Sequence, residues 1–285
     1  MDTRRRPDHR GAGLVVYLVV AFGWSWSWWL AMVPAGATST PGQGWPTHLP
    51  GLLGPALGAV AAAATEGGTA ALRALGRSLT RPPRDRLTWL MIAAPLVLWS
   101  VAAAADQMAG RAGDVLVYSG AASASSLGGL LAVLGYVLVV NGIGEELGWR
   151  GYLADRLLDR HGLRRTATVV WVVWGLWHVP LFWVVSDFRA MSVATVVGWT
   201  IGLWCGSLAL TWLYVRNERS TLVVAVWHTA YNLTTAASVG EGLPAALSTT
   251  GVVLLAAVLL VKASGPRVPG QPGRVRGPRS REPRS

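Results

Sequence analysis

Three short segments of an otherwise apolar chain carry polar side chains of the types that perform hydrolysis. NGIGEELGWRGYL covers residues 141–153, WGLWHVPLF covers 174–182 and WHTAYN covers 227–232. Ionisable groups within apolar segments are costly and usually functional. A buried carboxylate can act as a general base near neutral pH, and imidazole and amide groups at the same depth can belong to the same site. These segments are therefore the first candidates for a site.

The first segment predicts different roles for its two carboxylates. On a helix, Glu146 and Arg150 share a face at i,i+4 spacing and can form an ion pair. Glu145 points about 100° away, and its own i+4 neighbour is Trp149. We therefore predict that Glu146 is structural and that Glu145 lacks a counter-charge, which is a setting suited to a general base. The alternative is a charged helix cap, because four more charged residues follow within ten positions.

The candidate residues of the three segments lie at similar depth. Measured from the nearest basic or terminal residues at the helical rise, Glu145 lies about 16 Å, His178 about 18 Å and His228 about 13 Å into its segment. Asn232 follows His228 at i+4 and shares its face. Pro180 follows His178 and frees backbone carbonyls, which opens local space. A lone buried histidine can simply bond a neighbouring helix, but four polar groups at one level predict a site.

The three segments resemble the motifs of the CPBP family. EELGWRGYL is similar to the EExxxR motif, WGLWHVP to the aromatic-xxx-His motif, and WHTAYN to the HxxxN motif. The family comprises intramembrane proteases related to the CAAX prenyl endopeptidase and to bacteriocin-processing and abortive-infection-type proteins. The resemblance covers residues 127–239, and Glu146 and Arg150 match its supporting acid and arginine. The second motif begins with Trp174, where phenylalanine is common.

The resemblance implies an all-α bundle of about eight transmembrane helices with a water-accessible site inside the membrane. It places the water-activating carboxylate on Glu145, with His178 as its partner. It places oxyanion binding on His228 and Asn232. The function that we expect is an intramembrane endopeptidase that hydrolyses peptide bonds without a covalent intermediate. A serine route lacks support, because the motifs contain no GxSxG elbow.

The sequence is compatible with a zinc-dependent site and with a metal-free one. Glu145, His178 and His228 make up a His₂Glu set of the kind that catalytic zinc uses with water in the fourth position. HExxH is absent, so one helix does not supply two of these ligands. A metal-free glutamate mechanism uses the same residues, and we prefer it to the zinc-dependent one.

Two other classes of function fit the same composition. One is a catalytically silent membrane scaffold or bacteriocin-immunity-type protein with the same fold, which the presence of all four candidate residues disfavours. The other is a small transporter, which the lack of an internal repeat disfavours. We expect a membrane protein or peptide as substrate, anionic lipid at the cytoplasmic face and no nucleic acid. A requirement for prenylated substrates is not assumed.

The composition requires a membrane protein to position these groups. The chain has 285 residues, of which 52% are hydrophobic and only 14% charged, against about 25% charged in soluble domains. Its net charge of +11 fits nucleic-acid binding, but its mean hydropathy of +0.40 does not. Apolar stretches predict eight spans: 13–33, 50–65, 87–105, 127–146, 166–185, 193–215, 221–239 and 244–261.

The basic residues predict the topology. If the N-terminus is cytoplasmic, all of the 25 lysines and arginines except Arg111 and Arg189 lie on the cytoplasmic side. This asymmetry is what the positive-inside rule expects. We predict a multi-pass protein of the cell membrane with both termini in the cytoplasm, where the arginines attract anionic lipid.

The remaining segments complete the predicted organisation. Residues 1–12 form a basic N-terminus, 13–263 the transmembrane bundle with its protease-like core at 127–239, and 264–285 a disordered basic tail. Residues 66–86 combine arginines with leucines at helical spacing, which predicts an amphipathic helix on the cytoplasmic leaflet. Small-xxx-small patterns in the second and sixth spans predict close helix packing; their glycines are Gly54 and Gly58, and Gly198, Gly202 and Gly206.

Overall fold

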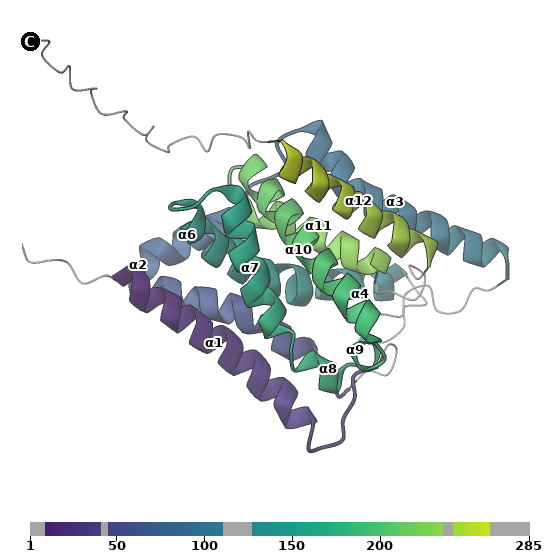
Figure 1. The fold of residues 1–285 in the computed structure, drawn as a ribbon, viewed down its shortest axis with the longest axis horizontal. Coiled ribbons are helices and arrows are strands. Elements are labelled where there is room, and N and C mark those ends of the chain that lie inside the picture. The colour runs from purple at the N-terminus through teal and green to yellow at the C-terminus, as the bar shows by residue number, and fades with distance from the viewer. Residues whose placement is uncertain (1–8, 41–44, 111–126, 236–241, 263–285) are drawn as a thin grey trace, which may run out of the picture.

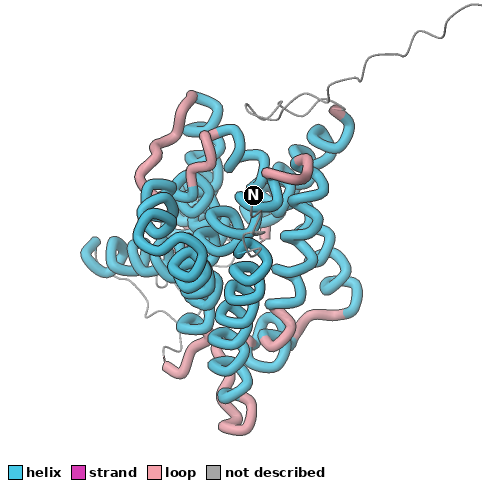
Figure 2. Tube along the Cα trace, turned by 90° about the vertical axis from the view of Figure 1, so that its left-hand side faces the viewer, coloured by secondary structure: helices cyan, strands magenta, loops and turns pink. Residues whose placement is uncertain are grey.

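A computed structural model describes residues 9–40, 45–110, 127–235 and 242–262. These residues form an all-α bundle without a strand (Figures 1 and 2). Most of the predicted basic N-terminus, the whole of the predicted tail at 264–285 and Arg111 lie outside the described residues.

The helices follow one another along the chain with short connections. They are α1 (His9–Met32), η1 (Leu49–Leu53), α2 (Gly54–Ser78), α3 (Arg86–Met108), α4 (Leu127–Val137), η2 (Leu138–Ile143), α5 (Gly144–Gly148), η3 (Trp149–Ala154), α6 (Asp155–Leu158), α7 (Leu163–Trp177), α8 (Leu181–Val184), α9 (Ser186–Arg189), α10 (Val193–Arg216), α11 (Thr221–Thr235) and α12 (Leu243–Val261). η1 is a 3-10 helix, whereas η2 and η3 are π-helical.

Seven helical segments in the described part of the chain are long and apolar enough to cross a membrane, which confirms a polytopic membrane fold. The predicted span at 221–239 is the exception. α11 is described over only 15 residues, which is shorter than the roughly 20 that a span requires. Most of its side chains are buried, and it packs against η2 and α3 inside the bundle. Seven of the eight predicted spans are therefore found in the described part of the chain, and the eighth, 221–239, extends beyond the described residues.

The second span is longer than predicted because a charged residue within it has partners. The sequence placed its end at residue 65, before Glu66, but α2 continues to Ser78 through a kink at Gly68, where φ is 54°. Glu66 pairs with Arg156 and accepts a hydrogen bond from the Tyr152 hydroxyl at 2.8 Å. The predicted amphipathic helix at 66–86 is thus the continuation of α2 and ends eight residues earlier.

The fourth span is also longer than predicted, for the same reason. Its end was placed at Glu146, but α4, η2, α5, η3 and α6 form one helical run to Leu158. Glu146 and Arg150 at its centre pair with each other inside the bundle, so they do not end the helix. π-helical turns lie immediately before and after α5. Such turns often occur at functional sites.

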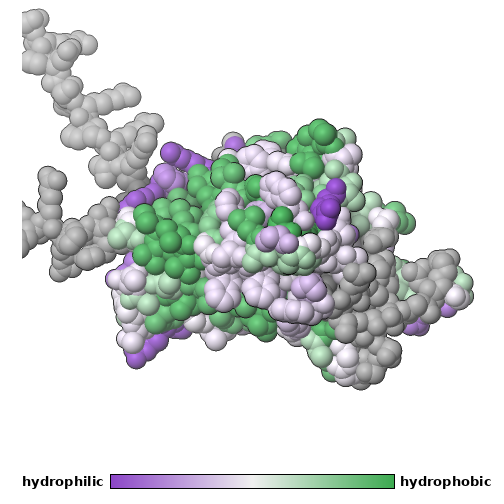
Figure 3. Space-filling view, turned by 90° about the horizontal axis from the view of Figure 1, so that it is seen from below, coloured by the Kyte–Doolittle hydropathy of each residue, from purple (hydrophilic) through white to green (hydrophobic). Residues whose placement is uncertain are grey.

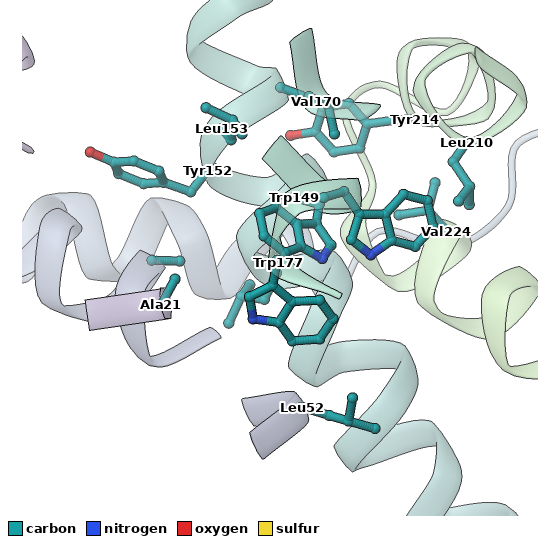
Figure 4. Close-up of a cluster of buried hydrophobic side chains, with 14 of the residues drawn as sticks. Ala21, Leu52, Trp149, Tyr152, Leu153, Val170, Trp177, Leu210, Tyr214 and Val224 are labelled. Carbon is teal, nitrogen blue, oxygen red and sulfur yellow. The ribbon is translucent and has the colours of Figure 1, made fainter. Parts of the chain in front are cut away.

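Buried tryptophans join the first helix to the motif-bearing helices. Trp29 and Trp149 both pack edge-on against Trp177, with ring centroids 4.8 and 5.5 Å apart. Figure 4 shows Trp149 and Trp177 next to each other, with Leu52 and Tyr152 nearby. The indole of Trp177 donates to the Ser25 hydroxyl at 2.8 Å. α1 therefore supports the helix that carries the second motif.

The basic helix ends gather at one end of the bundle. Arg216 pairs with Asp85 at 2.6 Å, and Arg219 pairs with Asp155 at 2.9 Å. Arg164 donates to backbone carbonyls at the end of α12. These contacts join the ends of helices that are far apart in sequence. Such an arrangement is consistent with the predicted gathering of the basic residues on one side of the membrane. Figure 3 shows apolar side chains along the flank and hydrophilic ones toward the left edge. The assignment of this end to the cytoplasm stays a prediction.

Only one of the two predicted small-residue faces is packed. A Cβ at Gly58 would lie 2.6 Å from the Tyr17 carbonyl oxygen, and one at Gly54 would lie 2.4 Å from the Ala21 carbonyl oxygen. Gly54 and Gly58 thus allow α2 to lie close to α1, as predicted. A Cβ at Gly198, Gly202 or Gly206 would meet nothing within 4 Å among the described residues. The prediction of close packing at these three positions is therefore wrong for the described chain.

The difference between the packed glycines of α2 and the glycines of α10 predicts that a glycine-to-alanine substitution affects stability in opposite directions at the two places. Gly58→Ala should destabilise the protein by about 1–3 kcal/mol, because the added methyl overpacks the α1–α2 contact. Gly198→Ala should leave stability unchanged or raise it by roughly 0.5–1 kcal/mol, because alanine is the better helix former. Thermal unfolding of both variants in detergent measures the difference. Equal melting temperatures would contradict the α1–α2 contact.

Candidate active site

The first motif places an ion pair fully inside the bundle. Arg150 donates from Nη1 to both oxygens of Glu146, at 2.8 and 3.0 Å. Both side chains are 0% exposed. The pair that the spacing predicted is therefore present, and it neutralises one of the two adjacent carboxylates.

The third motif binds to this pair. His228 Nδ1 lies 2.7 Å from Oε1 of Glu146. Because a carboxylate only accepts, Nδ1 carries the hydrogen and donates it, which leaves Nε2 as the ring nitrogen for other partners. A carboxylate that holds one ring nitrogen in this way orients the imidazole and fixes its tautomer. Glu146 is thus committed to two partners, Arg150 and His228.

Glu145 has a different environment. It is 3% exposed, and its Oε2 accepts a hydrogen bond from the indole Nε1–H of Trp174 at 2.8 Å. No lysine or arginine in the described part of the chain forms an ion pair with it. Among the described residues, the hydrogen-bond partner of this carboxylate is therefore a neutral donor, as expected for a group without a counter-charge.

The second motif breaks its helix at the histidine. α7 ends at Trp177, His178 caps it, and α8 begins after Pro180. His178 Nδ1 donates to the Trp174 carbonyl oxygen at 2.7 Å, which leaves Nε2 as an acceptor. Its ring is surrounded by aromatic rings at 5.0–6.2 Å between centroids: Trp174, Trp177, Phe188 and Trp199. Among the described residues it has no hydrogen bond to Glu145, and Trp174 contacts both.

Asn232 is held by the first motif. Its Nδ2 donates to Oδ1 of Asn141 at 2.6 Å, so the amide orientation is fixed by a residue of η2. Asn232 is half-buried, and His228 is buried one turn before it on α11. The two thus contact the same helical run from one face of α11, as their i+4 spacing predicted.

The residues considered for zinc are not gathered into a ligand set. Among the described residues, no group of three or more His, Cys, Asp and Glu side chains is arranged to hold a metal ion. Of the His₂Glu set, His228 turns Nδ1 to Glu146 and His178 turns Nδ1 to its own helix. As described, these residues are not gathered around a metal position, and the mechanism proposed below uses side chains alone.

Two neighbours of the site were not predicted as site residues. Trp174 was noted only as an aromatic, because spacing does not tell which way its indole N–H points. His48 lies in the connection before η1, where its Nδ1 bonds the Ser39 hydroxyl at 2.8 Å. Burial, together with the nearby His178, lowers the pKa of His48 to about 4, so its ring is neutral at pH 7. No pattern in the sequence links a histidine of this connection to the second motif.

Comparison with known proteins agrees with the motif region. Residues 127–234 match a family described as type II CAAX prenyl endopeptidase Rce1-like. A stretch of 102 residues is 28% identical to CAAX prenyl protease 2 of Methanococcus maripaludis, and it covers 34% of this chain and 38% of that relative. The resemblance to the CPBP family is thereby confirmed over the segment that holds all three motifs. This segment of the chain is therefore similar to the Rce1-like family of type II CAAX prenyl endopeptidases.

Proposed function

We propose that the protein is an intramembrane endopeptidase that hydrolyses a peptide bond with water activated by Glu145. The observation that carries this proposal is the difference between the two adjacent carboxylates. Glu146 is bound to Arg150 and His228, whereas Glu145 accepts its hydrogen bond from a neutral indole. A buried carboxylate without an ionic partner is a suitable general base.

The proposed reaction proceeds in two proton transfers. Glu145 removes a proton from a water molecule, whose oxygen attacks the scissile carbonyl carbon. The tetrahedral intermediate then collapses, the carbon–nitrogen bond breaks, and Glu145 returns the proton to the leaving amine. His178 assists by accepting a hydrogen bond from the same water at Nε2, because its Nδ1–H is held by the Trp174 carbonyl. No covalent bond to the protein is needed.

The third motif is proposed to stabilise the oxyanion. An amide has two N–H donors, and Asn232 uses one of them for Asn141. The second can donate to the developing negative charge. His228 donates from Nε2 when both ring nitrogens carry a proton, and Glu146 fixes the ring for this purpose. One well-placed oxyanion donor contributes about 3–4 kcal/mol to the transition state.

The substrate that we propose is a peptide segment of a membrane-bound protein. Glu145 and His178 lie on helical segments long enough to cross a membrane, and the matched relative is named a CAAX prenyl protease. The alignment covers 38% of that relative, so a prenylated cysteine is one candidate feature of the substrate and an unmodified peptide is the other.

Cleavage by the purified full-length chain in liposomes tests the proposal. The probes are two internally quenched peptides of identical sequence, one with a farnesylated cysteine fourth from its C-terminus and one without the lipid. Glu145→Gln and His178→Ala should each lower kcat by roughly 10²–10⁴-fold, because each removes a group that handles protons. Fluorescence increase and mass spectrometry of the fragments provide the measurement.

Asp187→Asn is the matched control, since Asp187 carries a carboxylate in α9 and no proposed role. It should cleave like the wild type. If the wild-type protein and the variants cleave neither probe, the result favours the alternative that the protein is a catalytically silent scaffold with the same fold. If wild type and Glu145→Gln cleave equally, the assignment of the base is wrong.

The buried ion pair predicts a separate effect on stability. Arg150→Met should cost about 3–5 kcal/mol, because it leaves Glu146 without its guanidinium partner. Glu146→Leu combined with Arg150→Met should recover much of this loss, since apolar replacement of a buried pair is often neutral. Activity should stay low in the double variant, because His228 loses the carboxylate that orients it. Thermal unfolding and peptide cleavage, measured on both variants, separate the two effects. A double variant with full activity would contradict the role given to Glu146.

A further inference from the structure

Trp174 contacts four of the six motif residues. Its indole N–H donates to Glu145, and its carbonyl oxygen accepts from His178. The Arg150 guanidinium lies over its ring, 4.7 Å from the centroid. The His228 ring meets it edge-on at 5.7 Å. Trp174 is therefore the residue through which the three motifs meet.

We propose that the indole N–H of Trp174 is a positioning group that orients the Glu145 carboxylate toward the attacking water. This inference rests on the proposed function, and it assigns a role that phenylalanine, common at this position in the family, cannot perform. A phenyl ring is smaller and has no donor. The indole N–H is the hydrogen-bond donor that the phenylalanine form of the motif lacks.

The hydrogen bond has a clear geometric consequence. With Oε2 held at 2.8 Å by Nε1, rotation of the carboxylate is restricted and Oε1 is left for the water. Orientation of reacting groups contributes strongly to catalysis, and a displacement of about 1 Å can cost roughly 10²-fold in rate. A neutral donor orients the Glu145 carboxylate without pairing it with a full positive charge. Glu146, in contrast, is paired with the positive charge of Arg150.

The indole is itself fixed by other groups. Trp174 is 5% exposed and lies in the last turn of α7. The Arg150 guanidinium covers one face of the ring, which is a favourable cation–π contact, and the guanidinium is in turn held by Glu146. A donor whose own orientation is locked by neighbouring groups is what precise positioning requires.

The chain offers a matched control on the same helix. Trp177 is fully buried, and its indole N–H also donates at 2.8 Å, but to the Ser25 hydroxyl of α1. Trp174→Phe and Trp177→Phe therefore delete the same atoms from the same helix. If Trp174 merely filled space, the two variants would behave alike.

Steady-state cleavage of the quenched peptide that the wild type accepts distinguishes these cases. Trp174→Phe should lower kcat about tenfold with KM unchanged, because orientation of the base is lost while substrate binding is kept. Trp177→Phe, which borders the His178 ring, should lower the melting temperature by a similar amount and lower kcat clearly less than Trp174→Phe does. Equal kcat for both variants, or an effect of Trp174→Phe on KM alone, would overturn the proposal.

A second replacement guards against a folding defect. Benzothienylalanine, introduced at position 174 through a suppressed stop codon, keeps the bicyclic shape and replaces the N–H by sulfur. It should reproduce the loss in kcat with the melting temperature of the wild type, and the same replacement at position 177 should not. Full kcat with benzothienylalanine at 174 would also overturn the proposal. These outcomes can be distinguished from a failure of the proposed function. In that case the wild type itself would not cleave the peptide, or Glu145→Gln would cleave it normally.

Discussion

The ion pair of Glu146 and Arg150 lies inside the bundle at 0% exposure, and the arrangement of the site depends on keeping it neutralised. Removing two charges from water costs several kcal/mol each unless they are paired and hydrogen-bonded. Arg150 supplies two bonds to Glu146, and His228 of α11 supplies a third. The ring of Trp174 on α7 covers the guanidinium. One buried pair therefore draws three helices to the same point.

The same constraint separates the two carboxylates. Arg150 and His228 both face Glu146, so the adjacent Glu145, turned about 100° around the helix, meets α7 instead. There it accepts the Trp174 indole N–H. Two chemically identical residues thus acquire different properties from their partners, which is how neighbouring acids take different roles in hydrolytic sites. The supporting pair and the proposed base are two results of one packing arrangement.

The sequence predicts contacts within one segment better than those between segments. The i,i+4 spacing was enough to predict the Glu146–Arg150 pair. The common depth of the three motifs was enough to predict that they converge. Two helix ends were misplaced, at residue 65 and at Glu146, because charges were taken to mark the membrane surface. Glu66 and the first motif are instead paired inside the bundle. The direction of the Trp174 indole depends on a neighbouring helix, which spacing along one segment does not encode.

The π-helical turns explain why a regular 3.6-residue period does not predict the side-chain directions along the run that carries the first motif. Each π turn contains an extra residue, which rotates the residues after it by about 100° relative to a straight α-helix. η2 and η3 lie on either side of α5, so the residues before, within and after the motif point in directions that a 3.6-residue period does not give. Asn141 in η2 meets Asn232 on α11, whereas Glu145 in α5 meets Trp174 on α7. One helical run can therefore present polar groups to two different helices, which a uniform helix with a single polar face cannot do.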